Sequence, residues 1–390
     1  MAVINLQRQS KQTSAAKFDQ TQASERPTAW RLLWRLATLL GGVFAFEHAQ
    51  ATDVPEDSAE AMYHYYDGGG VIASGPALLV RKKVNDTLSL SAGYYVYSVS
   101  NASIDVVTTA SKFKEVRQEY SFGTDYVYRD SKLSFSAATS REPDYTANSF
   151  GLDIAQETFG GMTTVNVGFT RGEDKVLKHK DPTFSDYAQH WMYRFGVAQI
   201  LTPHWIMSVN GEIVADDGYL SSPYRVARVF GAAVPENDPR TRSSRAVDFK
   251  VIGDLGSRDA VHAEYRYFWD NWAIKANTME FGYSRYFGEN WLADTSVRYY
   301  RQTKALFYSD NAQSDTLYIS RNRQLSQFHD ADLGGRVTYS LGKVSGDFDV
   351  KLNASVHYTK FNFDDFTDIR TGKLYTYGAS SVQLYASATF

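Results

Sequence analysis

The chain has 390 residues and a formal net charge of −3, with 15 % aromatic residues, 27 tyrosines, 9 prolines and no cysteine. The lack of cysteine excludes disulfide frameworks, thiolate metal sites and cysteine nucleophiles. Without residues 1–51 the remaining chain is still more acidic. A nucleic-acid partner normally requires a concentrated basic surface, and this charge balance gives no sign of one.

Residues 1–51 are predicted to be a signal peptide with an extended n-region. Arg31 and Arg35 precede an apolar run at 36–46, and residues 49–51 have the A-x-A form of a cleavage site. The run is shorter than the roughly 20 residues that a membrane-spanning helix needs, so a helical anchor is the less favoured alternative. We expect cleavage after Ala51 and a single domain over 52–390.

Beyond Thr52, stretches of about ten residues with alternating apolar and polar side chains recur along the chain, for example at 88–96, 120–128 and 348–358. Because side chains alternate across a strand, each stretch predicts a strand with one apolar face. Short polar turns and longer polar connections follow one another between the stretches. The longer connections lie at 100–114, 172–186, 217–243, 308–328 and 361–373.

This alternation predicts an all-β fold, an antiparallel transmembrane β-barrel of about 16 strands with short periplasmic turns and long outer loops. The weakest strand is the first, and 14 strands remain if it is a plug or a tether. The predicted strands lie near 60–67, 71–84, 87–99, 115–129, 132–141, 146–158, 162–172, 187–200, 204–216, 244–254, 260–271, 273–286, 291–306, 329–341, 347–360 and 376–390.

The last strand places Val382, Leu384 and Phe390 on one face and ends on the phenylalanine, as the closing strands of outer-membrane barrels do. We therefore expect the barrel-assembly machinery to recognise this strand. A soluble sandwich is the alternative, in which the apolar rows would form a core. Aromatic residues near the strand ends favour lipid, because such rings gather at membrane interfaces. Examples are Trp191, Tyr193, Trp205, Trp269, Trp272, Trp291, Tyr299 and Tyr300.

Several segments in order resemble the bacterial family catalogued as domain of unknown function 3570. They are Tyr65 to Gly70, Pro76 to Lys82, Ser103 to Val106, Asp217 to Leu220, Pro223 to Arg225, Pro239 to Arg242, Glu264 to Phe268, Phe307 to Asp310 and Asp364 to Phe366. The resemblance covers nearly all of the exported chain. It implies an outer-membrane-type barrel, hints at periplasmic flavin-related or redox partners, and transfers no catalytic residue.

The rows predicted to face the lumen carry charges of both signs. Opposing rows of acid and base would set a transverse field in a pore and select solutes by charge. The alternative, which we favour, is a hydrated lumen neutralised by ion pairs between neighbouring strands. The residues are Arg194, Glu212, Asp248, Lys250, His262, Glu264, Arg266, Glu280, Asp294, Arg298, Arg336 and Lys351.

The predicted outer segment 217–245 is rich in arginine, whose planar guanidinium groups suit carboxylate or phosphate. Folded inward, such a loop would bind an anionic solute or narrow the pore. The alternatives are contacts with lipopolysaccharide phosphates or simple solvation of the loop. The candidate anion-contacting residues are Arg225, Arg228, Arg240 and Arg242, with Arg245 beside them.

Metal and enzyme sites receive little support from the sequence. Asp364, Asp365 and Asp368 lie together on the last predicted loop, but a calcium site needs six to eight oxygen ligands. His262 with Glu264 is the one candidate acid–base pair, and no G-x-S-x-G or H-E-x-x-H motif is present. We expect no metal, no cofactor and no enzyme activity; an outer-membrane hydrolase is the alternative.

The pattern favours a porin-like or surface protein in the outer membrane of a Gram-negative bacterium, which passes or recognises small solutes. Its partners would be outer-membrane lipid and lipopolysaccharide. The alternative function is a non-conducting barrel that serves as a scaffold for periplasmic redox or flavin-related proteins.

Overall fold

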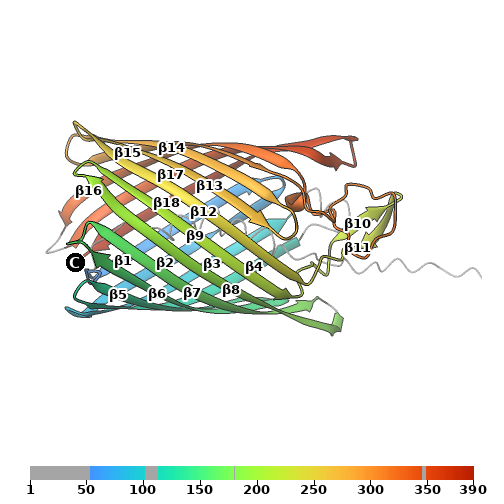
Figure 1. Ribbon diagram of the computed structural model, residues 1–390, viewed down its shortest axis with the longest axis horizontal. Coiled ribbons are helices and arrows are strands. Elements are labelled where there is room, and N and C mark those ends of the chain that lie inside the picture. The colour runs from blue at the N-terminus through green and yellow to red at the C-terminus, as the bar shows by residue number, and fades with distance from the viewer. Residues whose placement is uncertain (1–52, 102–112, 180, 345–347) are drawn as a thin grey trace, which may run out of the picture.

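The computed structural model describes residues 53–101, 113–179, 181–344 and 348–390, so the predicted signal peptide and its cleavage site lie outside the described residues. Sixteen antiparallel strands form one closed barrel (Figure 1). They are β1 (Ser58–Gly68), β2 (Val71–Asn85), β3 (Leu88–Asn101), β4 (Phe113–Tyr128), β5 (Ser131–Glu142), β6 (Tyr145–Thr158), β7 (Thr163–Lys178), β8 (Asp181–Thr202), β9 (Trp205–Gly218), β12 (Thr241–Gly256), β13 (Asp259–Asp270), β14 (Lys275–Phe287), β15 (Trp291–Gln302), β16 (Phe328–Val344), β17 (Phe348–Asp368) and β18 (Lys373–Thr389).

The barrel closes where the first strand meets the last. β1 pairs with β18 over its whole length, from Ser58 opposite Thr389 to Gly68 opposite Ala379. The predicted strand at 60–67 is therefore part of the wall, and the 14-strand alternative is wrong. Closure leaves the barrel without a free edge, so the backbone amides and carbonyls of every strand find partners within the sheet.

Two predicted outer connections, 172–186 and 361–373, are mostly strand. β7 continues to Lys178 and β8 begins at Asp181, while β17 continues to Asp368. The polar side chains of these segments suggested loops. The backbone of a strand that extends beyond the lipid still needs hydrogen bonds, and the neighbouring strand supplies them. The predicted connection 100–114 lies largely outside the described residues.

The two ends of the barrel differ. At one end, which we call the turn end, the described connections are short, as at 86–87, 129–130 and 203–204, and β18 ends there. At the opposite end, the loop end, lie two long connections, 219–240 and 303–327. Residues 241–243, predicted to lie in a loop, belong to β12.

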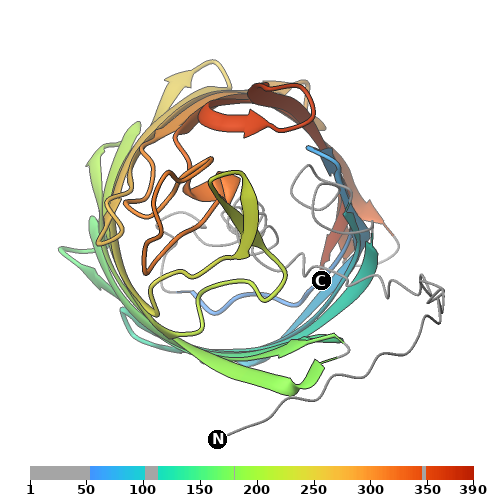
Figure 2. The ribbon, with the colours of Figure 1, turned by 90° about the vertical axis from the view of Figure 1, so that its right-hand side faces the viewer.

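The two long connections fold together into a cap across the mouth at the loop end (Figure 2). Residues 219–240 form the hairpin β10 (Val226–Val229) and β11 (Ala232–Pro235), and 303–327 include the short 3-10 helix η1 (Arg323–Leu325). Phe230 and Gly231 both have positive φ, which suits the tight turn of a hairpin. Isolated bridges join Val229 to Ala312 and Asn237 to Ile319, so the two connections behave as one unit.

The outward rows of the barrel are apolar and exposed, whereas the inward rows are largely polar. Phe281 and Val297, at neighbouring positions on β14 and β15, are both 57 % exposed on the outer surface. Such rows suit a lipid environment, since no protein layer covers them. Two residues assigned to the aromatic belt face inward instead: Trp272 is buried at the loop end, and Tyr300 donates a hydrogen bond to Gln302.

Among the described residues, no helix has the length and apolar character required to cross a membrane.

Substitution at two neighbouring positions on β15 tests whether its apolar row faces lipid and its polar row faces the cavity. Val297→Arg puts a charge on the outer apolar surface and should lower the free energy of unfolding by about 2–4 kcal/mol in lipid vesicles. Ser296→Arg places the same side chain on the cavity wall and should cost clearly less, because water solvates the charge there. A denaturant titration in vesicles measures the free energy of unfolding of both variants. Equal losses of stability would contradict an outer row that faces lipid.

Candidate functional site

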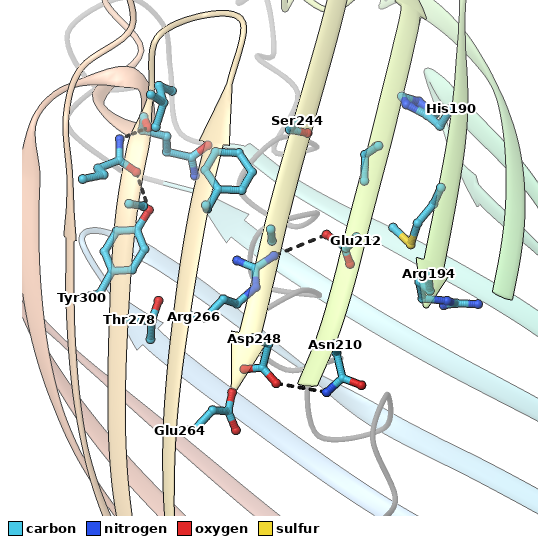
Figure 3. A pocket seen from close by; sticks show the side chains of 18 of the residues that line it. His190, Arg194, Asn210, Glu212, Ser244, Asp248, Glu264, Arg266, Thr278 and Tyr300 are labelled. Carbon is cyan, nitrogen blue, oxygen red and sulfur yellow. Dashed lines mark hydrogen bonds and ion pairs between the residues drawn. The ribbon is translucent and has the colours of Figure 1, made fainter. Parts of the chain in front are cut away.

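The barrel encloses a polar cavity of about 1600 Å³ that is lined by inward side chains from most of the wall and by the cap. Figure 3 shows side chains of both charges pointing into it, from His190 near the loop end to Glu264 deeper in the barrel. Eleven carboxylates and eight lysine or arginine side chains line it, so the wall has a small acidic excess. This cavity is the candidate functional site.

All the residues predicted to face the lumen lie on inward rows, although not all touch the cavity. Eight line it directly: Arg194, Glu212, Asp248, Lys250, Glu264, Arg266, Glu280 and Arg298. The other four lie nearer the turn end of their strands, where inward rows continue: His262, Asp294, Arg336 and Lys351.

Most of these charges form ion pairs with an inward side chain of the adjacent strand or of the strand beyond it. Arg194 donates to Asp153 at 2.7 Å, and Arg336 lies 2.8 Å from Asp294. The partners are about 20 to 40 % exposed, so water screens them and each pair contributes little stability. The same pattern joins Arg266 to Glu212 (3.3 Å), Lys250 to Glu264 (3.4 Å) and Arg298 to Asp330 (3.1 Å).

The candidate acid–base pair does not form. His262 Nε2 lies 3.2 Å from Glu280 on the next strand, and Glu264 instead pairs with Lys250. Glu280 lies opposite Glu264 and diagonally across from His262, and diagonal neighbours on one face are within reach of long side chains. His262 is therefore one more member of the paired lumen wall.

The sequence pattern did not predict a connected group of polar side chains near the loop end. His190 on β8 lies between Asp174 on β7 and Asp216 on β9, with ring nitrogens 2.8 Å and 2.7 Å from the carboxylate oxygens. The Tyr145 hydroxyl on β6 donates to the same Asp174 carboxylate. These residues are scattered along the chain, and only the strand register brings them together.

The predicted arginine cluster is divided among separate partners. Arg240 donates two hydrogen bonds of 2.8 Å to Asp186, and Arg228 donates to the Gly231 carbonyl. Arg242 faces inward, pairs with Asp270 and lies 4.7 Å from the Trp272 ring centre. Arg225 lies in the cap, where its carbonyl accepts from the Glu236 amide, and Arg245 lies on the outward row of β12.

Arg321 fastens the cap to the wall, a role that the sequence did not indicate. Its guanidinium pairs with Asp310 at 2.6 Å, donates to the Thr367 carbonyl of β17 and lies over the Phe366 ring at 4.4 Å. Its backbone amide donates to the Glu236 carboxylate, which follows β11. One nearly buried residue therefore joins the two parts of the cap through its backbone and ties them to the barrel through its side chain.

A neighbour in the cap, Arg323, projects into the cavity. It is 2 % exposed, and its guanidinium lies 5.7 Å from the Tyr375 ring and 5.3 Å from the Tyr377 ring on β18. A guanidinium over aromatic rings is attracted by their negative faces. The arginine of η1 thus holds the inner surface of the cap against the wall.

A second attachment joins the cap to the turn between β5 and β6. The Tyr224 hydroxyl donates to Asp144 at 2.6 Å and accepts from the His179 amide. Burial raises the pKa of the Asp144 carboxyl, and the hydrogen bond from Tyr224 only partly opposes that rise. Asp144 also lies in a group with Glu115 and Glu142, whose carboxylate oxygens are within 4.8 Å of one another.

The three aspartates on the last predicted loop do not converge on one point. Asp364 lies 3.4 Å from His329, Asp365 accepts from the Gln327 amide, and Asp368 pairs with Arg370. Asp364 and Asp365 both accept from Gln327, whereas Asp368 faces Arg370, so the three carboxylates do not form a shared cation site.

A family model described as "Protein of unknown function (DUF3570)" matches residues 98–378. No relative was found among the curated proteins. Among solved structures, a bacterial polysaccharide outer membrane secretin has a TM-score of 0.50 at 10 % identity, over 85 % of this chain and 98 % of that one. CdiB from Acinetobacter baumannii has 0.47 at 10 %, over 85 % and 60 %. The OmpT loop-deletion variant of Vibrio cholerae has 0.45 at 8 %, over 87 % and 100 %. The fold is that of outer-membrane barrels.

Removal of one partner of the Arg242–Asp270 pair should destabilise the loop end. The Asp270 side chain is fully buried, and it also accepts from the Ile274 amide. Arg242→Met leaves that carboxylate without its cation and should lower the free energy of unfolding by about 3 kcal/mol. Adding Asp270→Asn should recover part of the loss, because the amide is neutral and still accepts from Ile274.

The matched control is Arg240→Met, which removes the same group from the more exposed pair with Asp186. Its expected cost is below about 1 kcal/mol. Denaturant titrations of the refolded barrels give the free energy of unfolding of the two single variants and the double variant. Equal losses for Arg242→Met and Arg240→Met would show that burial of Asp270 does not matter.

Proposed function

We propose that this chain, which belongs to the family of proteins of unknown function DUF3570, is an outer-membrane channel for small polar solutes. In this proposal the solute crosses the lumen along the paired charges of the wall, and the cap narrows the mouth at the loop end. Signal cleavage after Ala51 and entry through the barrel-assembly machinery are parts of the same proposal.

The observation that carries this proposal is the chemistry of the cavity. Its volume of about 1600 Å³ holds many waters, and charged side chains line it on nearly every side. A barrel whose interior stayed dry would need apolar or fully buried side chains, because isolated charges are costly away from water. The half-exposed pairs, such as Arg194 with Asp153, instead suit a water-filled path.

The paired wall also bears on selectivity. Because most lysines and arginines already face a carboxylate one or two strands away, the wall presents alternating dipoles with a small acidic excess. We infer weak charge selectivity and a preference for solutes that exchange hydrogen bonds with such a wall.

The cap supports gating at the loop end. It crosses the mouth as one unit and is fastened through Arg321 to β17 and through Tyr224 to the turn before β6 (Figure 2). These are a few polar attachments at the rim, in contrast to the continuous ladders of the wall. Release of an attachment would widen the mouth without disturbing the barrel.

The second candidate function is a non-conducting barrel that holds periplasmic partners. It draws support from the burial of Arg321 and Arg323, whose side chains hold the cap against β17 and β18. In that case the cap would be a permanent plug, and the functional surface would be the turn end.

Planar-bilayer recordings distinguish the two functions. We expect discrete conductance steps from the refolded barrel. Arg321→Met should give a larger step with more frequent transitions, because it removes the hydrogen bond from the cap to Thr367 of β17 and the ion pair with Asp310 within the cap. The control is Arg370→Met, which removes an equal charge from the exposed pair with Asp368 at the same end and should leave the step unchanged.

Absence of conductance in the native barrel and in Arg321→Met would refute the channel and favour the plugged scaffold. Equal steps in the native and Arg321→Met proteins would refute gating by the cap while leaving the channel intact.

A further inference from the structure

Four cations form a row on the outer surface of the barrel, at the loop end of β12 to β17. We name them the basic belt: Arg245, Lys275, Arg301 and Lys360, which lie on β12, β14, β15 and β17. Each is exposed, and each lies on the outward row of its strand. Within the part of the chain that the structure describes, no carboxylate lies at ion-pair distance from any of the four side chains.

The strand register sets the spacing of the belt. Arg245 and Lys275 lie opposite the same residue, Trp269 of β13, so they are two strands apart. Arg301 pairs with His329 of β16, and Lys360 pairs with Ala331, two residues along that strand. Neighbouring strands are about 4.8 Å apart, so Arg245 and Lys275 are separated by about 10 Å across the strands, and so are Arg301 and Lys360. Lys275 and Arg301 lie on the adjacent strands β14 and β15, about 5 Å apart in that direction.

The belt also lies at the edge of the apolar surface. Toward the middle of the barrel, exposed apolar or aromatic side chains follow on the same rows: Val247 after Arg245, Met279 after Lys275, Tyr299 before Arg301 and Tyr358 before Lys360. Such side chains lie at the boundary of the hydrocarbon layer. The four cations are therefore at the depth where lipid headgroups begin.

Several outward cations elsewhere have a carboxylate partner. At the turn end, Lys82 pairs with Asp57 and Arg285 lies near Asp259. On the opposite flank of the loop end, Arg171 pairs with Glu173, two residues from Lys175. The basic belt differs in being a row of positive charges without alternating acids.

We propose that the basic belt binds the phosphate groups of lipopolysaccharide in the outer leaflet. Arginine and lysine side chains at headgroup depth suit phosphate oxygens, and the guanidinium groups of Arg245 and Arg301 can each donate two parallel hydrogen bonds. The row spans several strands, so it matches an extended headgroup with more than one phosphate. The inference rests on the proposed outer-membrane barrel having its loop end at the cell surface, as short periplasmic turns predict, and does not depend on conduction.

The test uses nanodiscs of phosphatidylcholine that hold the native barrel and one of three additions. These are lipopolysaccharide, lipopolysaccharide stripped of its lipid phosphates, and phosphatidylglycerol. The number of added lipids retained by each barrel is measured by native mass spectrometry. We expect retention of intact lipopolysaccharide well above that of the other two.

The variant is Arg301→Gln with Lys360→Gln, and the matched control is Arg141→Gln with Lys175→Gln, which removes two outward cations from the opposite flank of the same end. A cation near an anionic lipid surface is worth roughly fivefold in affinity, so the belt variant should bind about 30-fold more weakly. The control variant should bind like the native barrel. The exposed glutamines should not prevent folding. A shift in gel mobility between unheated and heated samples verifies that each variant is folded.

Equal retention by the belt variant and the native barrel would overturn the proposal. So would equal binding of the phosphate-free lipid, or of phosphatidylglycerol, since the belt would then attract any lipid or any anion. Bilayer conductance of the belt variant should match that of the native protein. A barrel without conductance that still retains lipopolysaccharide would refute the channel and leave the belt standing.

Discussion

The closure of the sheet between β1 and β18 is the constraint on which the rest of the structure depends. A strand in lipid has no water to satisfy its amides and carbonyls, so an open edge would be very costly. The pairing from Ser58 opposite Thr389 to Gly68 opposite Ala379 removes that edge. Once the cylinder is closed, the alternation of side chains divides the chain into one surface for lipid and one for the lumen.

That division explains how so many charges coexist within a membrane-type fold. Each inward row carries polar groups, and the register places acids near bases one or two strands away. Lys250 pairs with Glu264 on the adjacent strand, and Arg266 reaches past β12 to Glu212. Half-exposed pairs of this kind add little stability, but they leave few isolated charges and keep the cavity wet. The polarity of the lumen is thus a property of the interleaved strands and of no single residue.

The cap adds the one part of the described structure that departs from the cylinder. It is held by polar attachments at the rim and by arginines packed on aromatic rings, as Arg323 is on Tyr375 and Tyr377. On the outer surface, in contrast, the belt of cations on β12 to β17 has no internal partners. Arginine therefore has two roles at the loop end: inside, it fixes the cap, and outside, it is available to the lipid headgroups.

The alternating pattern of the sequence was enough to predict the closed antiparallel barrel, all sixteen strands and the direction of the charged lumen rows, because period-two alternation is a local property of each strand. It could not determine where strands end beyond the lipid, as at β7 and β17, since polar residues suit both loops and wet strands. Nor could it pair His262 with Glu280, join Asp174 to His190 and Asp216, or assign Arg321 to the cap. Those contacts depend on register and on loops that meet only after the barrel has closed, so only the tertiary structure decided them.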